Sequence, residues 1–143
     1  MVVDNSSAFR ADPSIPLVVP EINARRIKDH KGIIANPNCA AITTLVPLWP
    51  IHQVNPVRRL IVSTYHAASG GGAALMEELE LSTRAYLDGK DYPPKVVKYP
   101  YAFNVFSHNT AIDMETGYND EETKVIKESK KIFDDQNIAV SAS

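Results

Sequence analysis

Short apolar runs bounded by turn residues recur through the first quarter of the chain. Residues 1–4 read as the end of a buried strand that enters a polar turn, and residues 16–20 and 32–36 are apolar runs flanked by proline, glycine or asparagine. Runs of this kind are typical of strands that are buried on both faces, as in parallel sheets. We therefore expect the three runs to form buried parallel strands.

Residues 39–49 show a pattern that favours a helix. The apolar residues are Ala40, Ala41, Ile42, Leu45, Val46 and Leu48. Proline lacks an N–H group and kinks or ends a helix, so the pattern predicts a helix from Cys39 to Trp49 that Pro47 kinks and Pro50 ends. This places Cys39 at the start of a helix.

The order strand, glycine loop and helix follows. Residues 57–65 are β-branched and apolar enough for a strand, Ser69 to Gly72 break the chain, and residues 73–87 favour a helix. Residues 90–100 are punctuated by proline and predict a loop, while residues 101–112 have no clean period and predict irregular or partly extended structure.

The last part of the chain predicts a helix and a strand. Asn119 and Glu122 have the spacing of a capping box, and Val125, Ile132 and Phe133 form a sparse apolar stripe that continues to about residue 135. Residues 138–142 then begin another strand. Both chain ends fall inside predicted sheet structure, and we expect the sequence to be an internal part of a larger fold.

Composition narrows the class of protein. With 143 residues, 44% of them hydrophobic, the chain has the size and core of one soluble domain. The net charge of −2 comes from interspersed charges, so we expect no nucleic-acid and no membrane partner, and a small molecule or a protein instead. One cysteine and scattered histidines indicate no disulfide, no metal site and a reducing compartment.

Cys39 is the first candidate for chemistry. The positive end of a helix dipole favours a thiolate, and backbone N–H groups at the helix start can stabilise an oxyanion formed where sulfur attacks a carbonyl. The alternative is that Cys39 is a buried and inert small hydrophobe, which is common for free cysteines.

Four further residues offer weaker signals. His66 ends a predicted strand before the glycine-rich loop and is either a proton carrier or a structural histidine. The loop can approach an anion, although it lacks the GxGxxG spacing and could be a plain turn. Glu121 and Lys124 lie one turn apart on the predicted last helix, and Arg10 could hold a phosphate or carboxylate; all three could equally be surface residues.

Five segments in this order resemble the aspartate-β-semialdehyde dehydrogenase family. They are Val3 to Arg10, Pro16 to Glu21, Asn36-Pro37-Asn38-Cys39, Ser63 to Gly72 and Gly117 to Lys124. The resemblance implies an α/β fold in which part of a Rossmann-type NADP domain, residues 1–38, joins part of an α+β, glyceraldehyde-3-phosphate-dehydrogenase-like catalytic and dimerisation domain, residues 39–143. It also implies a homodimer or homotetramer, with residues 101–112 contributing to the subunit interface.

The implied reaction interconverts L-aspartate 4-semialdehyde and 4-aspartyl phosphate, with NADP as cofactor, in the biosynthesis of lysine, threonine, methionine and isoleucine. The resemblance gives the site residues these roles: Cys39 as the nucleophile that carries a thioacyl intermediate, Arg10 and Lys124 on phosphate, His66 and Glu121 on the substrate, and Ser69 with Gly70 on NADP. It implies a bacterial cytoplasm, or a plastid if the source is a plant or alga.

The sequence departs from the family pattern in two places. His66 stands where glutamine is more common, and Ala40 stands where a small hydroxyl residue is common. The glycine-rich dinucleotide loop expected before Met1, and the substrate arginine and base histidine expected after Ser143, are not in the sequence, so we expect the 143 residues alone to be inactive. Two alternatives are a short noncatalytic paralogue that acts as a dimerising interaction module and a related reductase of another acyl phosphate or acyl thioester.

Overall fold

The computed structural model describes all residues from 1 to 143 and divides them into two compact units. Unit 1 comprises Met1–Thr64 and Ile112–Ser143, and unit 2 comprises Tyr65–Ala111. No helix in either unit combines the length and the apolar character that a membrane crossing requires.

Unit 1 begins with a small parallel sheet. Strand β1 (Val2–Asp4) pairs with β2 (Ile33–Ala35) in parallel, with Val3 opposite Ile34. Parallel strands at residues 1–4 and 32–36 are confirmed, but the predicted burial is found only in β2, since Val2 and Val3 of β1 are exposed.

The predicted strand at residues 16–20 is reduced to a single bridge between Leu17 and Ala35. Helix α1 (Pro20–Asn23) begins at once and continues into a 3₁₀ turn, Ala24–Asp29, and neither was predicted. Proline has a backbone angle suited to the first helical position, so Pro20 starts the helix where the apolar run suggested further strand.

Helix α2 (Cys39–Val54) starts at Cys39 as predicted, but Pro50 does not end it. A proline removes one hydrogen bond to the carbonyl four residues earlier, which is tolerable where water can reach that carbonyl. Pro47 and Pro50 are both exposed. The last turns of α2 are held instead by stacking of Trp49 and His52 against Phe133.

A second parallel pair lies on the other side of α2. Strand β3 (Arg59–Val62) pairs with β4 (Ala139–Ala142), and β3 is shorter than the predicted 57–65. Helix α4 (Asp120–Phe133) precedes β4 and has the predicted capping box, in which Asn119 accepts from the Glu122 N–H while Glu122 accepts from the Asn119 N–H.

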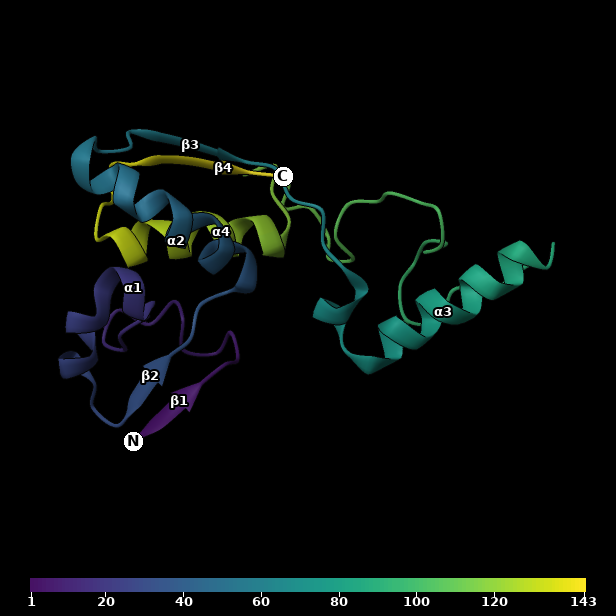
Figure 1. Ribbon diagram of the computed structural model, residues 1–143, viewed down its shortest axis with the longest axis horizontal. Coiled ribbons are helices and arrows are strands. Elements are labelled where there is room, and N and C mark those ends of the chain that lie inside the picture. The colour runs from purple at the N-terminus through teal and green to yellow at the C-terminus, as the bar shows by residue number, and fades with distance from the viewer. The chain divides into compact units, whose positions relative to one another are not determined.

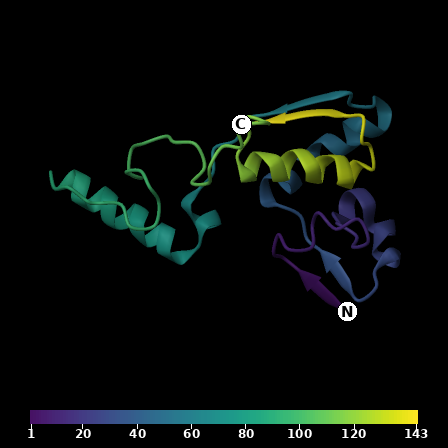
Figure 2. The same ribbon diagram turned by 180° about the vertical axis from the view of Figure 1, so that it is seen from behind.

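The core of unit 1 lies between these elements. Figures 1 and 2 show α2 and α4 side by side, with the β3–β4 pair on one side and α1 with the β1–β2 pair on the other. The buried apolar cluster between them has members in β2, α2 and α4 and in the residues just before α1 and β4; they are Leu17, Val19, Ala35, Leu45, Ile132, Phe133 and Ile138. This packing fixes the start of α2 against one face of α4.

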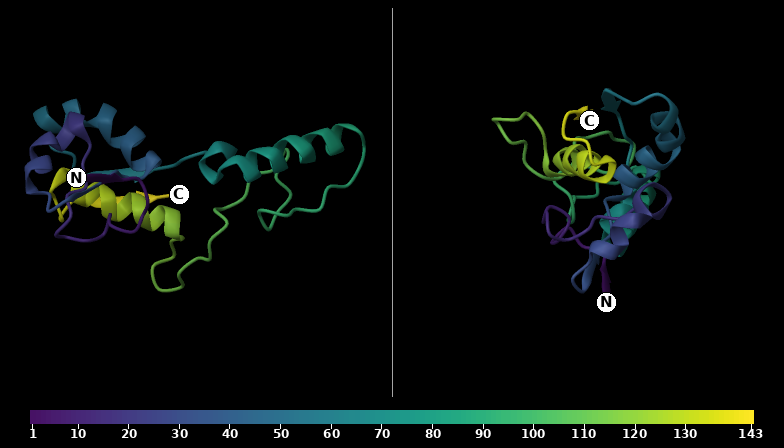
Figure 3. Two further views of the ribbon diagram at one scale, coloured as in Figure 1. Left: turned by 90° about the horizontal axis from the view of Figure 1, so that it is seen from below. Right: turned by 90° about the vertical axis from the view of Figure 1, so that its left-hand side faces the viewer.

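Unit 2 has one long helix. A 3₁₀ turn (Ala68–Gly71) leads into α3 (Ala73–Leu87), as the glycine loop predicted. The rest of unit 2 has no regular strand or helix and folds back along α3 (Figure 3, left). The carboxylate of Glu78 on α3 holds this return by accepting hydrogen bonds from the backbone N–H groups of Lys95, Val96 and Val97.

Candidate active site

The start of α2 is capped by Asn38. Its side-chain oxygen accepts hydrogen bonds from the N–H groups of Ala40 (2.8 Å) and Ala41 (3.3 Å), and Asn38 is only 6% exposed. An asparagine in this position satisfies N–H groups that have no partner within the helix. The cap fixes the backbone on which Cys39 begins the helix, and Cys39 itself is exposed.

One face of α4 meets this cap. Residues 121, 124 and 128 recur at helical spacing, so their side chains project from the same side of α4. The carboxylate of Glu121 accepts from the Asn38 side-chain amide at 2.6 Å and from Lys124 Nζ at 3.3 Å. The predicted pair of Glu121 and Lys124 therefore exists, and it stands against the residue that precedes Cys39.

Glu128 is the functional candidate that the sequence reasoning missed. One carboxylate oxygen accepts the Asn38 N–H at 2.6 Å, and the other lies 3.4 Å from Arg10 Nη1. Glu128 is 4% exposed, and this burial raises its pKa, although the Asn38 N–H and Arg10 act in the opposite direction. A glutamate within the apolar stripe of Val125 and Ile132 was the available signal, because charged residues are seldom buried unless they are paired.

Arg10 is held from two sides. Its Nη2 donates to the backbone oxygen of Asn5 at 2.9 Å, its Nη1 faces Glu128, and its buried Nε has no hydrogen-bond partner. Lys131 Nζ fastens the surrounding loop by donating to the carbonyl oxygens of Arg10, Asp12 and Ile15. Burial lowers the pKa of Lys131, while Asp12 and Glu128 partly offset the effect.

The helix start has one N–H group left over. Asn38 occupies those of Ala40 and Ala41, whereas the Cys39 N–H makes no hydrogen bond. The arrangement places Cys39 at the positive end of a helix dipole, with one N–H donor beside it.

Three predicted site residues lie in unit 2. His66 precedes the 3₁₀ turn, and Ser69 and Gly70 lie within it. Gly72 has φ +83°, which favours glycine, and no side chain caps the first turn of α3. Ser69 and Gly70 are exposed and lie beside an uncapped helix start, where backbone N–H groups can approach an anion.

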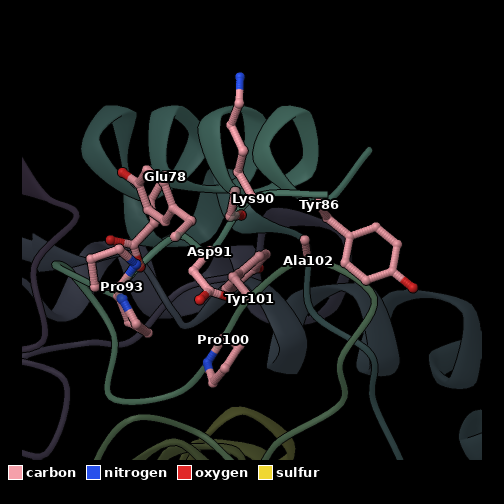
Figure 4. A pocket seen from close by; sticks show the side chains of 11 residues that line it. Glu78, Tyr86, Lys90, Asp91, Pro93, Pro100, Tyr101 and Ala102 are labelled. Atoms are coloured by element: carbon pink, nitrogen blue, oxygen red, sulfur yellow. The ribbon is translucent and has the colours of Figure 1, made fainter. Parts of the chain in front are cut away.

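Unit 2 also holds a pocket that contains none of the predicted site residues. It has a volume of about 540 Å³ and is walled by α3 and the proline-rich return, with Glu78, Tyr86 and Tyr101 among its lining (Figure 4). The candidate chemistry of unit 1 therefore rests on a surface built by α2, α4 and the Arg10 loop rather than on this pocket.

Two family models match the chain. Residues 48–143 match the model described as semialdehyde dehydrogenase, dimerisation domain, and residues 1–30 match semialdehyde dehydrogenase, NAD binding domain. Together the two ranges cover most of the sequence, in the order that the resemblance predicted.

Individual proteins agree with the family models. An aspartate-semialdehyde dehydrogenase from Synechocystis sp. is 47% identical over all of this chain, and one from Aquifex aeolicus is 48% identical. These matches span 42% and 43% of the two relatives, so the chain covers less than half of their length. A crystal structure of aspartate semialdehyde dehydrogenase II complexed with ASA from Vibrio cholerae superposes with a TM-score of 0.95 at 40% identity, covering 99% of this chain and 43% of that one.

Proposed function

The chain belongs to the semialdehyde dehydrogenase family, and from that premise we propose that it carries the nucleophile and the anion-binding residues of an aspartate-semialdehyde dehydrogenase. The α/β fold expected from the sequence is confirmed by both family models and by the Vibrio cholerae structure. The proposed reaction is the NADP-linked, phosphate-dependent interconversion of L-aspartate 4-semialdehyde and 4-aspartyl phosphate.

The single observation that carries the proposal is the meeting of α2 and α4 at Asn38. Its backbone N–H and side-chain amide bind Glu128 and Glu121, and the next residue is Cys39. The thiol therefore lies next in sequence to a residue that contacts Glu121, which is suited to bind an amino group. The same cluster contains Lys124 and Arg10, which are suited to bind phosphate. A purely structural helix start has no need of this set of charges.

In the biosynthetic direction the Cys39 thiolate attacks the acyl carbon of 4-aspartyl phosphate. A carbon–sulfur bond forms and the bond between the acyl carbon and the phosphate oxygen breaks. Arg10 and Lys124 bind the inorganic phosphate that leaves. The Cys39 N–H donates to the oxyanion of the tetrahedral state, and Glu121 binds the substrate ammonium. The product of this half-reaction is a thioester on Cys39.

We place the nicotinamide cofactor on Ser69 and Gly70. NADPH, when bound, supplies the hydride that converts the thioester to the aldehyde and releases the thiolate. The match of residues 1–30 to an NAD binding domain supports a nicotinamide cofactor, and the choice of NADP is part of this proposal. His66 is proposed to contact the substrate in the place where the family more often has glutamine.

The subunit arrangement is also proposed. The match of residues 48–143 to a dimerisation domain supports a homodimer. Exposed large apolar side chains are common in unit 2, where they include Met76, Tyr86, Leu87, Phe103 and Val105. We propose that a second copy of the chain covers them. The boundary between cofactor and catalytic domains at residues 38 and 39 remains a prediction that lies between the two matched ranges.

The test is turnover by the full-length natural polypeptide that contains these residues. Semialdehyde, NADP and phosphate should give NADPH, and Cys39→Ala should lower kcat by at least about 10³-fold while NADP binding is kept. Thr44→Ala, on the same helix, is the matched control and should keep wild-type turnover. A Cys39→Ala enzyme at the wild-type rate would remove the nucleophile from the proposal.

A further inference from the structure

Glu128 is a buried carboxylate that joins two separate parts of the candidate site. Its Oε2 accepts the Asn38 N–H at 2.6 Å, and its Oε1 faces Arg10 Nη1 at 3.4 Å. The Glu128 and Arg10 side chains are 5% and 12% exposed. The contact therefore lies largely out of water, where an ion pair is screened less than at the surface.

The fold by itself gives little reason for a charge in this position. Glu128 lies in the face of α4 that carries Val125 and Ile132 into the two apolar clusters. Burial of a charge is costly, and well-packed apolar residues often replace buried ion pairs without loss of stability. A carboxylate in this place is best explained by what its two oxygens hold.

We propose that Glu128 is a positioning residue of the reaction, which holds the Arg10 guanidinium in register with the Asn38 cap so that a phosphate on Arg10 lies beside Cys39. The inference rests on the proposed function, because it assigns Arg10 to phosphate and Cys39 to the acyl group. Glu128 contacts neither the phosphate nor the acyl group of the substrate. It acts through Arg10 and Asn38.

Lys131 makes the role of Glu128 separable from folding of the Arg10 loop. Lys131 fixes the backbone of the loop through three carbonyl oxygens, whereas the contact of Glu128 with this loop is to the Arg10 guanidinium. Replacing Glu128 by glutamine keeps an acceptor for the Asn38 N–H and removes the charge that faces Arg10. The backbone of the loop should stay in place.

The experiment compares Glu128→Gln with Glu122→Gln in the full-length natural polypeptide. Glu122 lies on the same helix, and glutamine can keep its capping-box contact, so this control should behave as wild type. For Glu128→Gln we expect the KM for phosphate to rise about tenfold and kcat to change by less than about threefold, because phosphate meets a misplaced arginine. In an Arg10→Ala background the same substitution should change this KM by less than about twofold.

A second readout does not depend on turnover. In the same protein, inorganic phosphate should slow alkylation of Cys39 by iodoacetamide, and Glu128→Gln should require about tenfold more phosphate for equal protection. The modified peptide identifies the thiol by mass.

The two proposals fail in different ways. If wild type shows no phosphate-dependent turnover, the proposed function is wrong, and the protection assay still decides the role of Glu128. If wild type is active but Glu128→Gln has an unchanged phosphate KM and unchanged protection, the positioning role is wrong. A fall in kcat with an unchanged phosphate KM and a lowered Tm would make Glu128 purely structural and would also overturn the inference.

Discussion

Asn38 uses each of its hydrogen-bonding groups around the thiol. Its side-chain oxygen caps α2, its amide donates to Glu121, and its backbone N–H donates to Glu128. One residue therefore ties the helix start to two carboxylates of α4. The stability of α2 should therefore depend on the side-chain oxygen of Asn38, and the position of Glu121 on the side-chain amide of Asn38.

Two substitutions separate these roles of Asn38. Asn38→Ala removes the cap and should lower the free energy of unfolding by about 1–2 kcal/mol. Asn38→Asp keeps a capping oxygen but places a carboxylate against Glu121, so it should retain more of that stability and still lose substrate affinity. Urea unfolding and the KM for the semialdehyde measure the two effects; equal behaviour of the variants would contradict the division.

The pH dependence of stability should reveal the burial of Glu128. Burial raises its pKa; Arg10 and the Asn38 N–H oppose the rise, and Glu121 adds to it, with Lys131 also nearby. A carboxyl with a raised folded-state pKa binds protons more readily in the folded than in the unfolded state. Its contribution to stability therefore falls as pH rises from the ordinary glutamate pKa through the raised one.

Glu128→Gln has no such titration. As pH rises across this window, the free energy of unfolding of the variant should increase relative to that of wild type. Urea titrations at several pH values measure this difference. A difference that is constant with pH would mean that the Glu128 carboxyl is not perturbed. Asp12 and Asp113 also have lowered pKa values, and because neither residue is changed in the variant, their contributions should cancel in the comparison.

At the residue scale, the sequence was informative where spacing along one element was enough. The pair of Glu121 and Lys124 followed from helical spacing, and the position of Cys39 followed from the flanking prolines. Glu128 was missed because its partners, Asn38 and Arg10, are 90 and 118 residues away in sequence. No local pattern reports such contacts. The roles assigned to the site residues stay predictions.

At the element scale, helices with strong end signals were predicted best. The glycine break predicted α3, and the capping box gave the start of α4. The end of α2 was predicted wrongly and α1 was not predicted at all, since each depends on how the surroundings accommodate a proline. Pro50 is exposed and continues a helix that aromatic stacking against Phe133 holds, whereas Pro20 begins one.

The hydrogen bonds of Glu78 lead to a prediction for residues 95–97, which fold back along α3. Burial raises the pKa of Glu78, but the hydrogen bonds that it accepts from backbone N–H groups lower the pKa by more. The net pKa is therefore lowered, and the carboxylate stays charged. Glu78→Ala leaves those N–H groups without an acceptor, at a cost of about 1–3 kcal/mol. Hydrogen exchange at Lys95, Val96 and Val97 should therefore accelerate.

The matched control is Glu80→Gln, because Glu80 is exposed and pairs only with Arg84. It should leave exchange at the three amides unchanged. Since the Glu78 pKa is lowered, its contribution to stability is present above the unfolded-state pKa and is lost as pH falls through the lowered value. If the amides of Lys95, Val96 and Val97 exchange at the wild-type rate in Glu78→Ala at neutral pH, the Glu78 carboxylate does not hold this segment.

At the scale of the whole molecule, the sequence predicted the fold class but not the assembly of its layers. The pairing of β3 with β4 joins segments about 80 residues apart, and α4 packs against α2 where both bury residues in the same cluster. Such long-range pairings follow from the burial of several apolar faces at once. The family resemblance supplied the fold class, which the family models confirm, whereas the structure alone gives these pairings.

The central claim is that Cys39 carries the acyl group of the substrate. The most direct measurement incubates the full-length natural polypeptide with semialdehyde and NADP, without phosphate, and follows NADPH while the peptides are analysed by mass spectrometry. The account predicts one NADPH per site, an aspartyl thioester on the peptide that contains Cys39, and its release when phosphate is added. An NADPH burst with no acyl group on Cys39, or with the acyl group on another residue, would contradict the account.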